Sequence, residues 1–548
     1  MPIRNPMLNI PDAERTPLVN QLLVLIEQVI EENLRLKETI QQLRDEVARL
    51  KGEKGKPKFK ASGMERETGS SPAASAPDGN GPDAQPPGKR PGSAKRSKTK
   101  QLAIHEIVTI PPSQPLPPGS RRKGHRDFIV QDLKIQARNT CYRLEDWQTP
   151  DGSWLRGELP ATLNGGHFGP ELRRYVLYQH HHCHVTQPLL YEQLTEWGID
   201  ISEGQINALL SNHNAVFFEE KDQLLSTGLE VSRSITVDDS GARHQGKNGY
   251  VTQVGNETFA WFSSTASKSR INFLQLLHAG RISHQINPHA LDYMREQGLP
   301  QEARRRVETH LTAAIAEPDC WAQHLDALGI DADRHRRIAT EGALLGGLIE
   351  KGFSLDLAIV SDGAGQFNIL LHGLCWIHAE RLVHKLIPLN DAHQQDQTLV
   401  RDEIWGLYAD LKAYQRDPDS DQAPALAARF DAVFTRRTSF ETLNQTLKRL
   451  HAHRKGLLLV LERPDIPLHT NGSEGDIRDY VKWRKTSGGT RSDLGRRCRD
   501  TFASLKKTCR KLGFSFWDYL ADRIESREAI PRLSLIIRQR ACAVSALP

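Results

Sequence analysis

Residues 234–239, Ser-Ile-Thr-Val-Asp-Asp, form a short apolar run with β-branched side chains that ends in two acidic residues. Residues 357–363, Leu-Ala-Ile-Val-Ser-Asp-Gly, form a similar apolar run farther along the chain that leads to one acidic residue. Such runs are typical of buried strands. Residues 249–263 predict two more strands around a turn at 255–257, and residues 373–376 predict another. Helical patterns separate these runs, so the sequence predicts a mixed α/β core.

Three acidic residues occupy the ends of predicted elements. Asp238 and Asp362 end two of the strands, and Glu474 lies in the first turn of a helix that opens at Asn471. Oxygen ligands without paired Cys or His favour Mg²⁺ or Mn²⁺ over Zn²⁺. Two such ions about 4 Å apart can activate a nucleophilic oxygen and stabilise the leaving oxygen of a phosphodiester. The chain has 67 acidic residues, so spacing alone also allows a chance arrangement.

Length, charge and cysteine content bound the class of protein. At 548 residues the chain is long enough for three or four domains. Its net charge of +6 permits a nucleic-acid partner without requiring one. We find no run of 18 apolar residues and no signal-peptide core over residues 1–16, so we expect no membrane partner. The seven Cys form no CxxC pair, which argues against a disulfide scaffold and a four-Cys zinc site and predicts a cytoplasmic protein.

Residues 17–51 carry a heptad pattern. The a positions hold Ile26, Asn33, Ile40 and Val47, and the d positions hold Leu22, Val29, Leu36, Leu43 and Leu50. β-branched residues at a, Leu at d and one Asn at a favour a parallel two-stranded coiled coil. We therefore predict a homodimer or higher oligomer through residues 17–51. The alternative is one amphipathic helix that packs on its own chain.

Residues 52–120 predict a disordered linker, because Gly, Pro, Ser and Ala dominate and no hydrophobic period survives. Two basic clusters lie in it, and the second includes Lys95 and Arg96. These charges suit non-specific phosphate contact. They equally suit a solvated tail.

The remaining chain is predicted to hold four parts. Residues 121–165 predict a β-hairpin module around the turn at 149–152, and residues 166–230 predict a helical region that resembles a helix-turn-helix, with Ser202 capping its second helix. Many helical hairpins share this pattern. Residues 180–184, His-His-His-Cys-His, cannot converge on one ion from a helix, so we expect a solvated histidine patch. The catalytic domain is predicted at 231–495, with helical insertions at about 281–355 and 390–456, and a C-terminal helical segment at 496–548.

Several blocks resemble the IS66 family of transposases. The first is residues 237–243 with 246–249, and the second joins residues 360–363 to Cys-Trp-Ile-His at 375–378. The third is residues 467–474 followed by 483–493, and the segment 507–520 is also similar. The resemblance covers roughly residues 120–525, and the N-terminal zipper and basic linker are similar to the family layout.

This resemblance implies an RNase H-like catalytic domain with a DDE triad, in which Asp238, Asp362 and Glu474 hold two Mg²⁺ (or Mn²⁺) ions. Asp238 matches the family block, and Asp239 points to the opposite face of its strand as a supporting or surface group. The DNA contacts that we predict are Arg484, Lys485, Arg491, Lys95 and Arg96. Cys375, Trp376 and His378 match a family block to which we assign no role.

Two departures from the family pattern concern local contacts. His469, Thr470, Asn471 and Gly475 stand where many members have an acidic residue, two Asn and an Arg. The usual N-terminal zinc-binding cysteines are absent, since only Cys141 lies near the hairpin, so no zinc is expected.

The implied function is an insertion-sequence transposase. It would bind terminal inverted repeats and target double-stranded DNA, cleave strands in a metal-dependent reaction and join the new 3′-hydroxyl to the target. Small accessory proteins of the same element are possible partners, and the implied location is the bacterial cytoplasm on the nucleoid. The alternatives are a catalytically silent dimeric repressor of the element and an RNase H-like nuclease that never joins DNA.

Overall fold

The computed structural model describes residues 16–22, 24–26, 28–29, 32, 103–160, 163, 166–309 and 314–545. The described residues up to residue 32 are helical from residue 17. The rest of the predicted coiled coil at 17–51 lies outside the described residues, as does the linker up to residue 102 with Lys95 and Arg96. The chain divides into two compact units, residues 1–35 with 139–548, and residues 36–138. The described part of the second unit, 103–138, contains no helix or strand.

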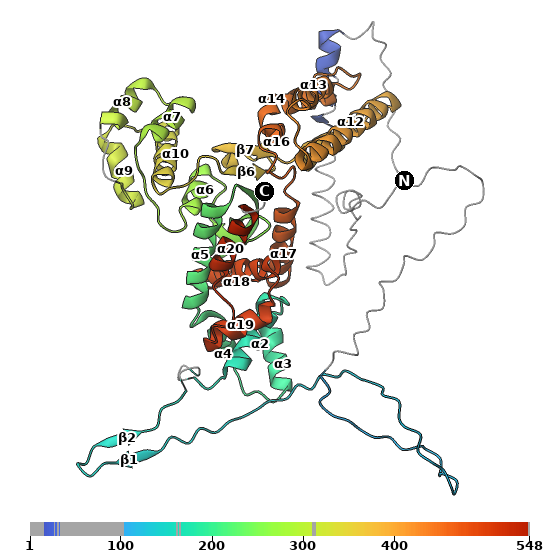
Figure 1. The fold of residues 1–548 in the computed structure, drawn as a ribbon. Helices are drawn as coiled ribbons and strands as arrows, with labels where there is room; N and C mark the ends of the chain where they lie inside the picture. Colours follow the sequence, from blue (N-terminus) through green and yellow to red (C-terminus); the bar gives the residue numbers. More distant parts are fainter. Residues whose placement is uncertain are drawn as a thin grey trace. The chain divides into compact units, whose positions relative to one another are not determined.

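A five-stranded mixed sheet forms the centre of the larger unit (Figure 1). Its strands are β3 (Ser234–His244), β4 (Lys247–Gly255), β5 (Ala260–Thr265), β6 (Ala358–Ser361) and β7 (Leu371–Leu374). Their order is β5-β4-β3-β6-β7, with antiparallel pairing from β5 to β3 and parallel pairing from β3 to β7. The predicted mixed α/β core is confirmed, and the strand order is consistent with an RNase H-like core.

Two predicted strand ends were wrong. β3 does not end at the acidic pair, because Asp238 and Asp239 pair with β4 and the strand continues to His244. The strand predicted at 373–376 ends at Leu374, and the next residues open helix α11 (Trp376–His384). A long antiparallel partner extends β3 past its apolar run, whereas β7 has only the short strand β6 to pair with.

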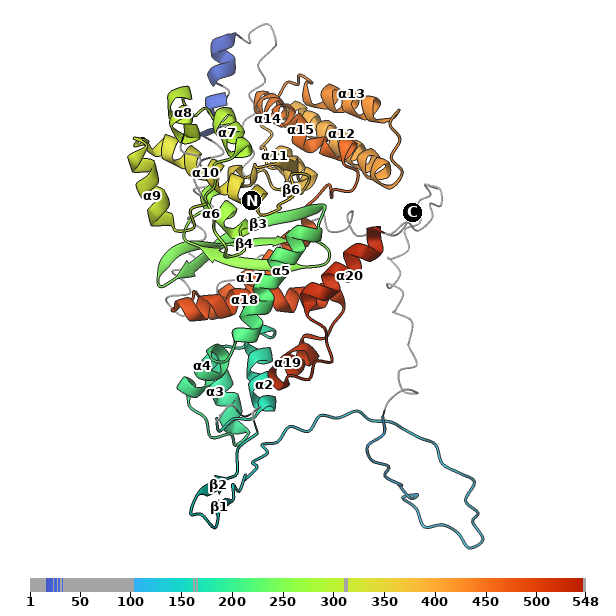
Figure 2. The same cartoon turned by 60° about the vertical axis from the view of Figure 1, so that its left-hand side comes forward.

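Helices cover both faces of the sheet (Figure 2). One face packs against α5 (Ala215–Val231) and α6 (Arg270–Leu277) in a core that includes Ile235 and Val237. The other face packs against α17 (Asn471–Ser487), whose Ile477, Tyr480 and Trp483 meet Val251 and Phe262 of β4 and β5. The apolar residues of β3 and β4 therefore have a buried environment on each side.

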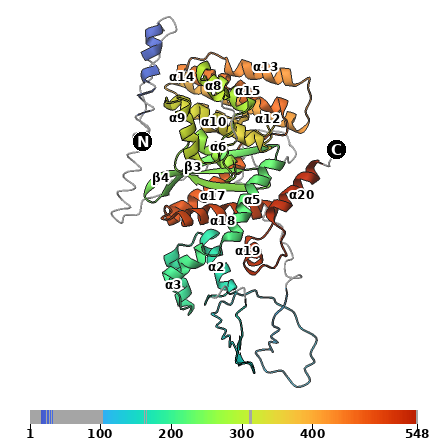
Figure 3. The same cartoon turned by 90° about the vertical axis from the view of Figure 1, so that its left-hand side faces the viewer.

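Helix α18 (Asp493–Leu512) closes the edge of the sheet at β5 (Figure 3). Three of its polar side chains, spaced four residues apart, accept hydrogen bonds from alternate backbone N–H groups of β5. The pairs are Asp500 with Ser264 at 2.8 Å, Ser504 with Phe262 at 2.9 Å and Thr508 with Ala260 at 3.1 Å. The helical period places these residues in one row, and the strand period presents every second N–H to them. This row protects the edge strand from pairing with another chain.

We expect Ser504→Ala to lower the free energy of unfolding by about 1–3 kcal/mol, because the buried Phe262 N–H would lose its acceptor. Thr501→Val is the matched control on the same helix, since Thr501 is also fully buried but its Oγ1 has no hydrogen-bond partner among the described residues. Urea denaturation checks both variants. Equal losses for the two would show that Ser504 contributes only packing.

The described residues within 146–231, which precede the sheet, hold a small hairpin and four helices. These are β1 (Asp146–Gln148), β2 (Trp154–Arg156), α2 (Pro170–His181), α3 (Gln187–Glu196), α4 (Glu203–Ser211) and α5. β1 and β2 pair antiparallel and are exposed. The predicted Ser202 cap is confirmed, because its side chain accepts a hydrogen bond from Gln205 N–H at 3.3 Å in a capping box.

The C-terminal helices share a core with this region. α19 (Phe516–Glu525) contacts α2, α18 contacts α4, and α20 (Leu533–Ser545) contacts α5. Their apolar side chains belong to one continuous cluster. The solvated histidine patch is wrong for His181, which is 2% exposed and stacks on Phe502 with ring centroids 4.1 Å apart. α2 packs against α18 there, and this contact removes the His181 ring from water.

Two further groups of helices, each with its own apolar cluster, lie between β5 and β6 and between α11 and α17. The first consists of α7 (Pro288–Glu296), α8 (Gln301–Thr309), α9 (Pro318–Ala327) and α10 (Asp333–Glu350). The second consists of α12 (Asp391–Arg416), α13 (Ala423–Phe434), α14 (Glu441–Ala452), α15 (Arg454–Leu457) and α16 (Leu459–Glu462). Within the described ranges, no helix has both the length and the apolar character needed to cross a membrane.

Candidate active site

Asp238 and Asp362 occupy equivalent positions on adjacent parallel strands. Thr236 of β3 pairs with Val360 of β6, and each aspartate follows two residues later. Asp238 lies within β3, and Asp362 follows the last residue of β6. The carboxylate of Asp362 is exposed and accepts a hydrogen bond from the Ala364 N–H at 2.9 Å. The two strands therefore bring these carboxylates to one end of the parallel pair.

The two aspartates interact electrostatically. Burial raises the pKa of Asp238 to about 6, and the negative charge of Asp362 adds to this shift. Two neighbouring carboxylates form a donor set that suits a divalent cation. Asp238 and Asp362 therefore fit the metal that the sequence predicts.

Glu474 lies at the start of α17, beside β3, and Ser473 Oγ is 2.5 Å from Thr236 Oγ1. The Glu474 carboxylate accepts hydrogen bonds from Arg381 at 3.3 Å and from Arg478 at 2.8 Å. Burial alone would raise the pKa of Glu474, but these two guanidinium groups hold it below its usual value. In the described part of the chain, no three His, Cys, Asp or Glu side chains are placed to hold one metal ion. Glu474 therefore does not join the aspartates in this geometry.

The first turns of α11 contribute two more side chains near the acids. His378 lies close enough to Asp238 to lower its pKa, and Arg381 Nη1 is 3.3 Å from His378 Nε2. A hydrogen bond in which the His378 ring N–H donates to the Cys375 sulfur raises the pKa of His378. Burial would raise the pKa of the Cys375 thiol, but the same interaction with His378 lowers it. Trp376 serves packing, because it is buried and donates to the Leu457 carbonyl at 2.9 Å.

Sequence reasoning missed Arg381. It lies three residues after His378, so both side chains emerge on the same face of α11. That spacing was visible in the sequence, but its ion pair with Glu474 joins residues far apart in the chain.

Asp239 faces away from this cluster. Its side chain is 6% exposed, forms an ion pair with Lys268 and accepts a hydrogen bond from Gln366 at 2.7 Å. Alternation along β3 explains why neighbouring aspartates have different partners. Asp239 thus holds the loop after β5 and the 3₁₀ turn η5 (Gly365–Phe367) against the sheet.

The predicted DNA contacts that are described lie at the C-terminal end of α17 and beyond it. Arg484 reaches β3, where its Nη1 is 3.4 Å from the position of a Cβ built on Gly241. Lys485 and Arg491 are exposed. Arg484 therefore lies against β3 at Gly241, which is three residues after Asp238 on the same strand.

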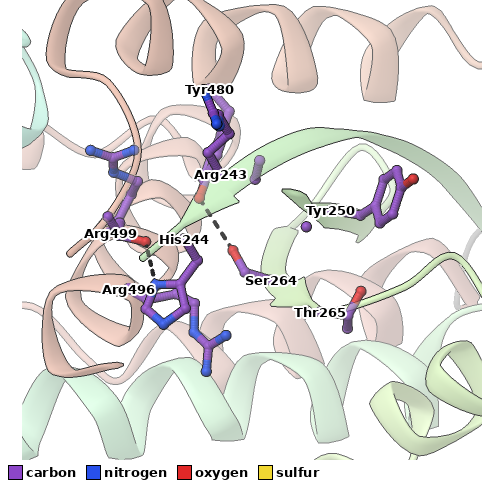
Figure 4. Close-up of a pocket in the computed structure, with 11 residues that line it drawn as sticks. Arg243, His244, Tyr250, Ser264, Thr265, Tyr480, Arg496 and Arg499 are labelled. Atoms are coloured by element: carbon purple, nitrogen blue, oxygen red, sulfur yellow. Dashed lines mark hydrogen bonds between the residues drawn. The ribbon is translucent and has the colours of Figure 1, made fainter. Parts of the chain in front are cut away.

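A basic pocket lies at the far end of the β3–β4 hairpin (Figure 4). Its lining includes three arginines, Arg243, Arg496 and Arg499, together with His244. His244 Nδ1 is 2.8 Å from Thr490 Oγ1, and Arg499 donates to the Gly488 carbonyl at 2.9 Å. The first bond holds the segment after α17 against the hairpin, and the second joins that segment to α18.

Comparison with known proteins identifies the family. The profile described as "Transposase IS66 family" matches residues 311–497, which include Asp362 and Glu474. An uncharacterized protein of Sinorhizobium fredii, y4jO, is 42% identical over 321 residues, which make up 58% of this chain and all of that relative. The chain belongs to the IS66 family of transposases, as its sequence blocks predicted.

We expect Asp238→Asn to stabilise the metal-free protein at pH 7. The folded pKa of about 6 exceeds the ordinary value of 3.8, so the native state binds the proton more tightly and loses stability as pH rises from about 4 to 6. Asn cannot ionise, so the gain reaches up to about 3 kcal/mol at pH 7 and vanishes below pH 4. Urea denaturation in EDTA, from below pH 4 to pH 7, measures this gain in the free energy of unfolding. Glu474→Gln should show the opposite sign at pH 7, because arginines stabilise that carboxylate.

Proposed function

We propose that this chain is a DDE transposase that binds the terminal inverted repeats of its element, cleaves DNA strands and transfers them to a target. The observation that carries the proposal is the register of β3 and β6, which puts Asp238 and Asp362 at matching positions on adjacent parallel strands. Glu474 begins the helix packed on β3. Membership of the transposase family supports the same chemistry.

In this proposal Asp238, Asp362 and Glu474 hold Mg²⁺ or Mn²⁺, two ions per site, and no zinc. Bound metal would supply Lewis-acid activation of the attacking oxygen and charge stabilisation at the leaving oxygen. The aspartates are already adjacent. Glu474 is hydrogen-bonded to Arg381 and Arg478, so it would have to leave these partners to act as a ligand.

The proposed DNA contacts lie on and after the same helix, α17. Arg484 lies beside β3, and Lys485 and Arg491 lie on the exposed segment that follows it. Arginine and lysine at such positions fix the register of a phosphate backbone without reading sequence. We assign base recognition to α2–α4, and dimer formation to residues 17–51, with accessory proteins of the element as further partners.

The test is a reaction of purified protein, Mg²⁺ and labelled DNA that carries the repeats flanking its own gene. We expect strand cuts at the repeat boundary followed by joining, and loss of both in EDTA and in Glu474→Gln. Cleavage without joining would favour the nuclease alternative. Binding without cleavage, even with the neighbouring small proteins added, would favour the repressor.

A further inference from the structure

The edge of β3 beyond the active site is open between two contacts. β6 pairs with β3 only through Ser234–Thr236. At the far end, Thr490 pairs with His244, donates to the Arg243 carbonyl at 3.0 Å and accepts from the Gln245 N–H at 2.8 Å. No described strand pairs with this edge between these two contacts.

The parity of the strand shows which backbone groups face this open edge. The Arg233 carbonyl accepts from Ala358 of β6 at one end, and the Arg243 carbonyl accepts from Thr490 at the other. Odd-numbered residues of β3 therefore direct their N–H and C=O groups to this side, while the alternate residues bond to β4. Between Arg233 and Arg243, the Asp239 N–H donates to the Asp238 carboxylate at 2.8 Å. Gly241 also faces this side, and its exposed position has no side chain to cover its N–H.

Positive charge borders the same edge. The Arg484 guanidinium lies 3.4 Å from where a side chain on Gly241 would begin. Arg243 and Lys247 continue this border at the hairpin tip, where both are exposed and Arg243 donates to the Gly246 carbonyl at 3.1 Å. In the part of the chain that the structure describes, none of these three cations forms an ion pair with a carboxylate. A backbone N–H beside unneutralised guanidinium groups is a site for an anionic oxygen.

We propose that the open edge of β3, with Gly241 N–H, Arg484, Arg243 and Lys247, is a binding track for the phosphates of the DNA strand that leaves the active site. The proposal rests on the proposed function, because it takes that reaction's DNA as the ligand. Gly241 lies three residue steps beyond Asp238, about 10 Å at the usual strand rise, which equals the axial rise of about three nucleotides of one DNA strand. The first phosphate held should therefore lie within about three nucleotides of the phosphate that is cleaved.

The test measures binding in EDTA, so it does not depend on cleavage. Duplexes carrying the terminal repeat are made with one neutral methylphosphonate at successive positions, and their affinities are compared for the wild type and Arg484→Gln. We expect neutralising one phosphate near the cleavage position to weaken wild-type binding about tenfold, the scale of one charge-assisted hydrogen bond. The same change should cost Arg484→Gln less than about twofold, because its contact is already lost.

Controls separate this track from general charge effects. Arg305→Gln removes an exposed arginine from α8, in the first insertion, and should leave the phosphate pattern unchanged. Arg243→Gln should lower the slope of log affinity against log salt by about 1, and Arg484→Lys should retain the wild-type slope. The proposal is overturned if the affinity loss from Arg484→Gln and the loss from each methylphosphonate are additive at every position, because no phosphate would then depend on Arg484. If the coupling appears but the wild type never cleaves in Mg²⁺, the track stands and the catalytic function fails.

Discussion

Asp362→Asn is expected to slow metal-dependent cleavage severely while leaving DNA affinity unchanged. The Asp362 side chain is exposed and its one described hydrogen bond, from the Ala364 N–H, can be accepted equally by an asparagine oxygen. The fold therefore tolerates the change. What asparagine removes is the negative charge opposite Asp238, and with it half of the carboxylate pair that suits a cation. The rate of strand cleavage should fall by about three orders of magnitude, the scale of losing one group that stabilises transition-state charge.

The matched control is Asp356→Asn. Asp356 is also an exposed aspartate, but it precedes β6 by two residues, whereas Asp362 follows the strand. Both substitutions remove one charge from the same β6 neighbourhood, so general electrostatic effects on DNA binding should be alike. Cleavage assays with Mg²⁺ and binding assays in EDTA measure the two properties separately. An Asp362→Asn protein that cleaves as fast as Asp356→Asn would remove Asp362 from the catalytic site.

The strands of the sheet could be predicted from the sequence because the patterns that indicate them are local. The β-branched runs before Asp238 and Asp362 are short, apolar and bounded by turn residues, and the structure buries every residue of β6. The positions of the two aspartates follow from that pattern. The register between the two strands could not be predicted, because the pairing of Thr236 with Val360 joins residues separated by the whole first insertion.

What the sequence could not supply is mostly polar and non-local. Asp500, Ser504 and Thr508 are hydrophilic residues at helical spacing, which normally indicate a solvent-facing row, yet they are buried against β5. The ion pair of Arg381 with Glu474 likewise joins residues that lie far apart in the sequence. Tertiary contacts decided these cases, because a polar side chain can be buried wherever a partner meets its hydrogen bonds.

Residues 166–230 illustrate the same limit at the level of domains. Their helical period predicts a helical region that resembles a helix-turn-helix, and the helices are present. Their apolar faces, however, belong to the same cluster as α18, α19 and α20. The N-terminal helices and the C-terminal segment therefore form one packed body, which places α2–α4 rigidly relative to α18.

Glu220→Gln is expected to show how strongly that body depends on one buried charge. Glu220 on α5 is fully buried and accepts hydrogen bonds from Arg523 at 2.7 and 3.0 Å, from Tyr519 at 2.8 Å and from the Leu533 N–H at 2.8 Å. It thus ties α5 to α19 and to the first residue of α20. Glutamine has nearly the same shape, so the substitution tests the charge without opening a cavity.

Removing the charge leaves Arg523 buried with less compensation and turns one acceptor oxygen into an NH₂ group that faces donors. Breaking a buried ion pair costs about 3–5 kcal/mol. We expect about 3 kcal/mol, because Asp522 remains paired with Arg523. Glu219→Gln is the control, since Glu219 is the exposed neighbour on the same helix. Urea denaturation gives the cost, and hydrogen exchange should show faster opening of α20 before the sheet. A cost equal to that of the control would mean that apolar packing alone holds α20 on α5.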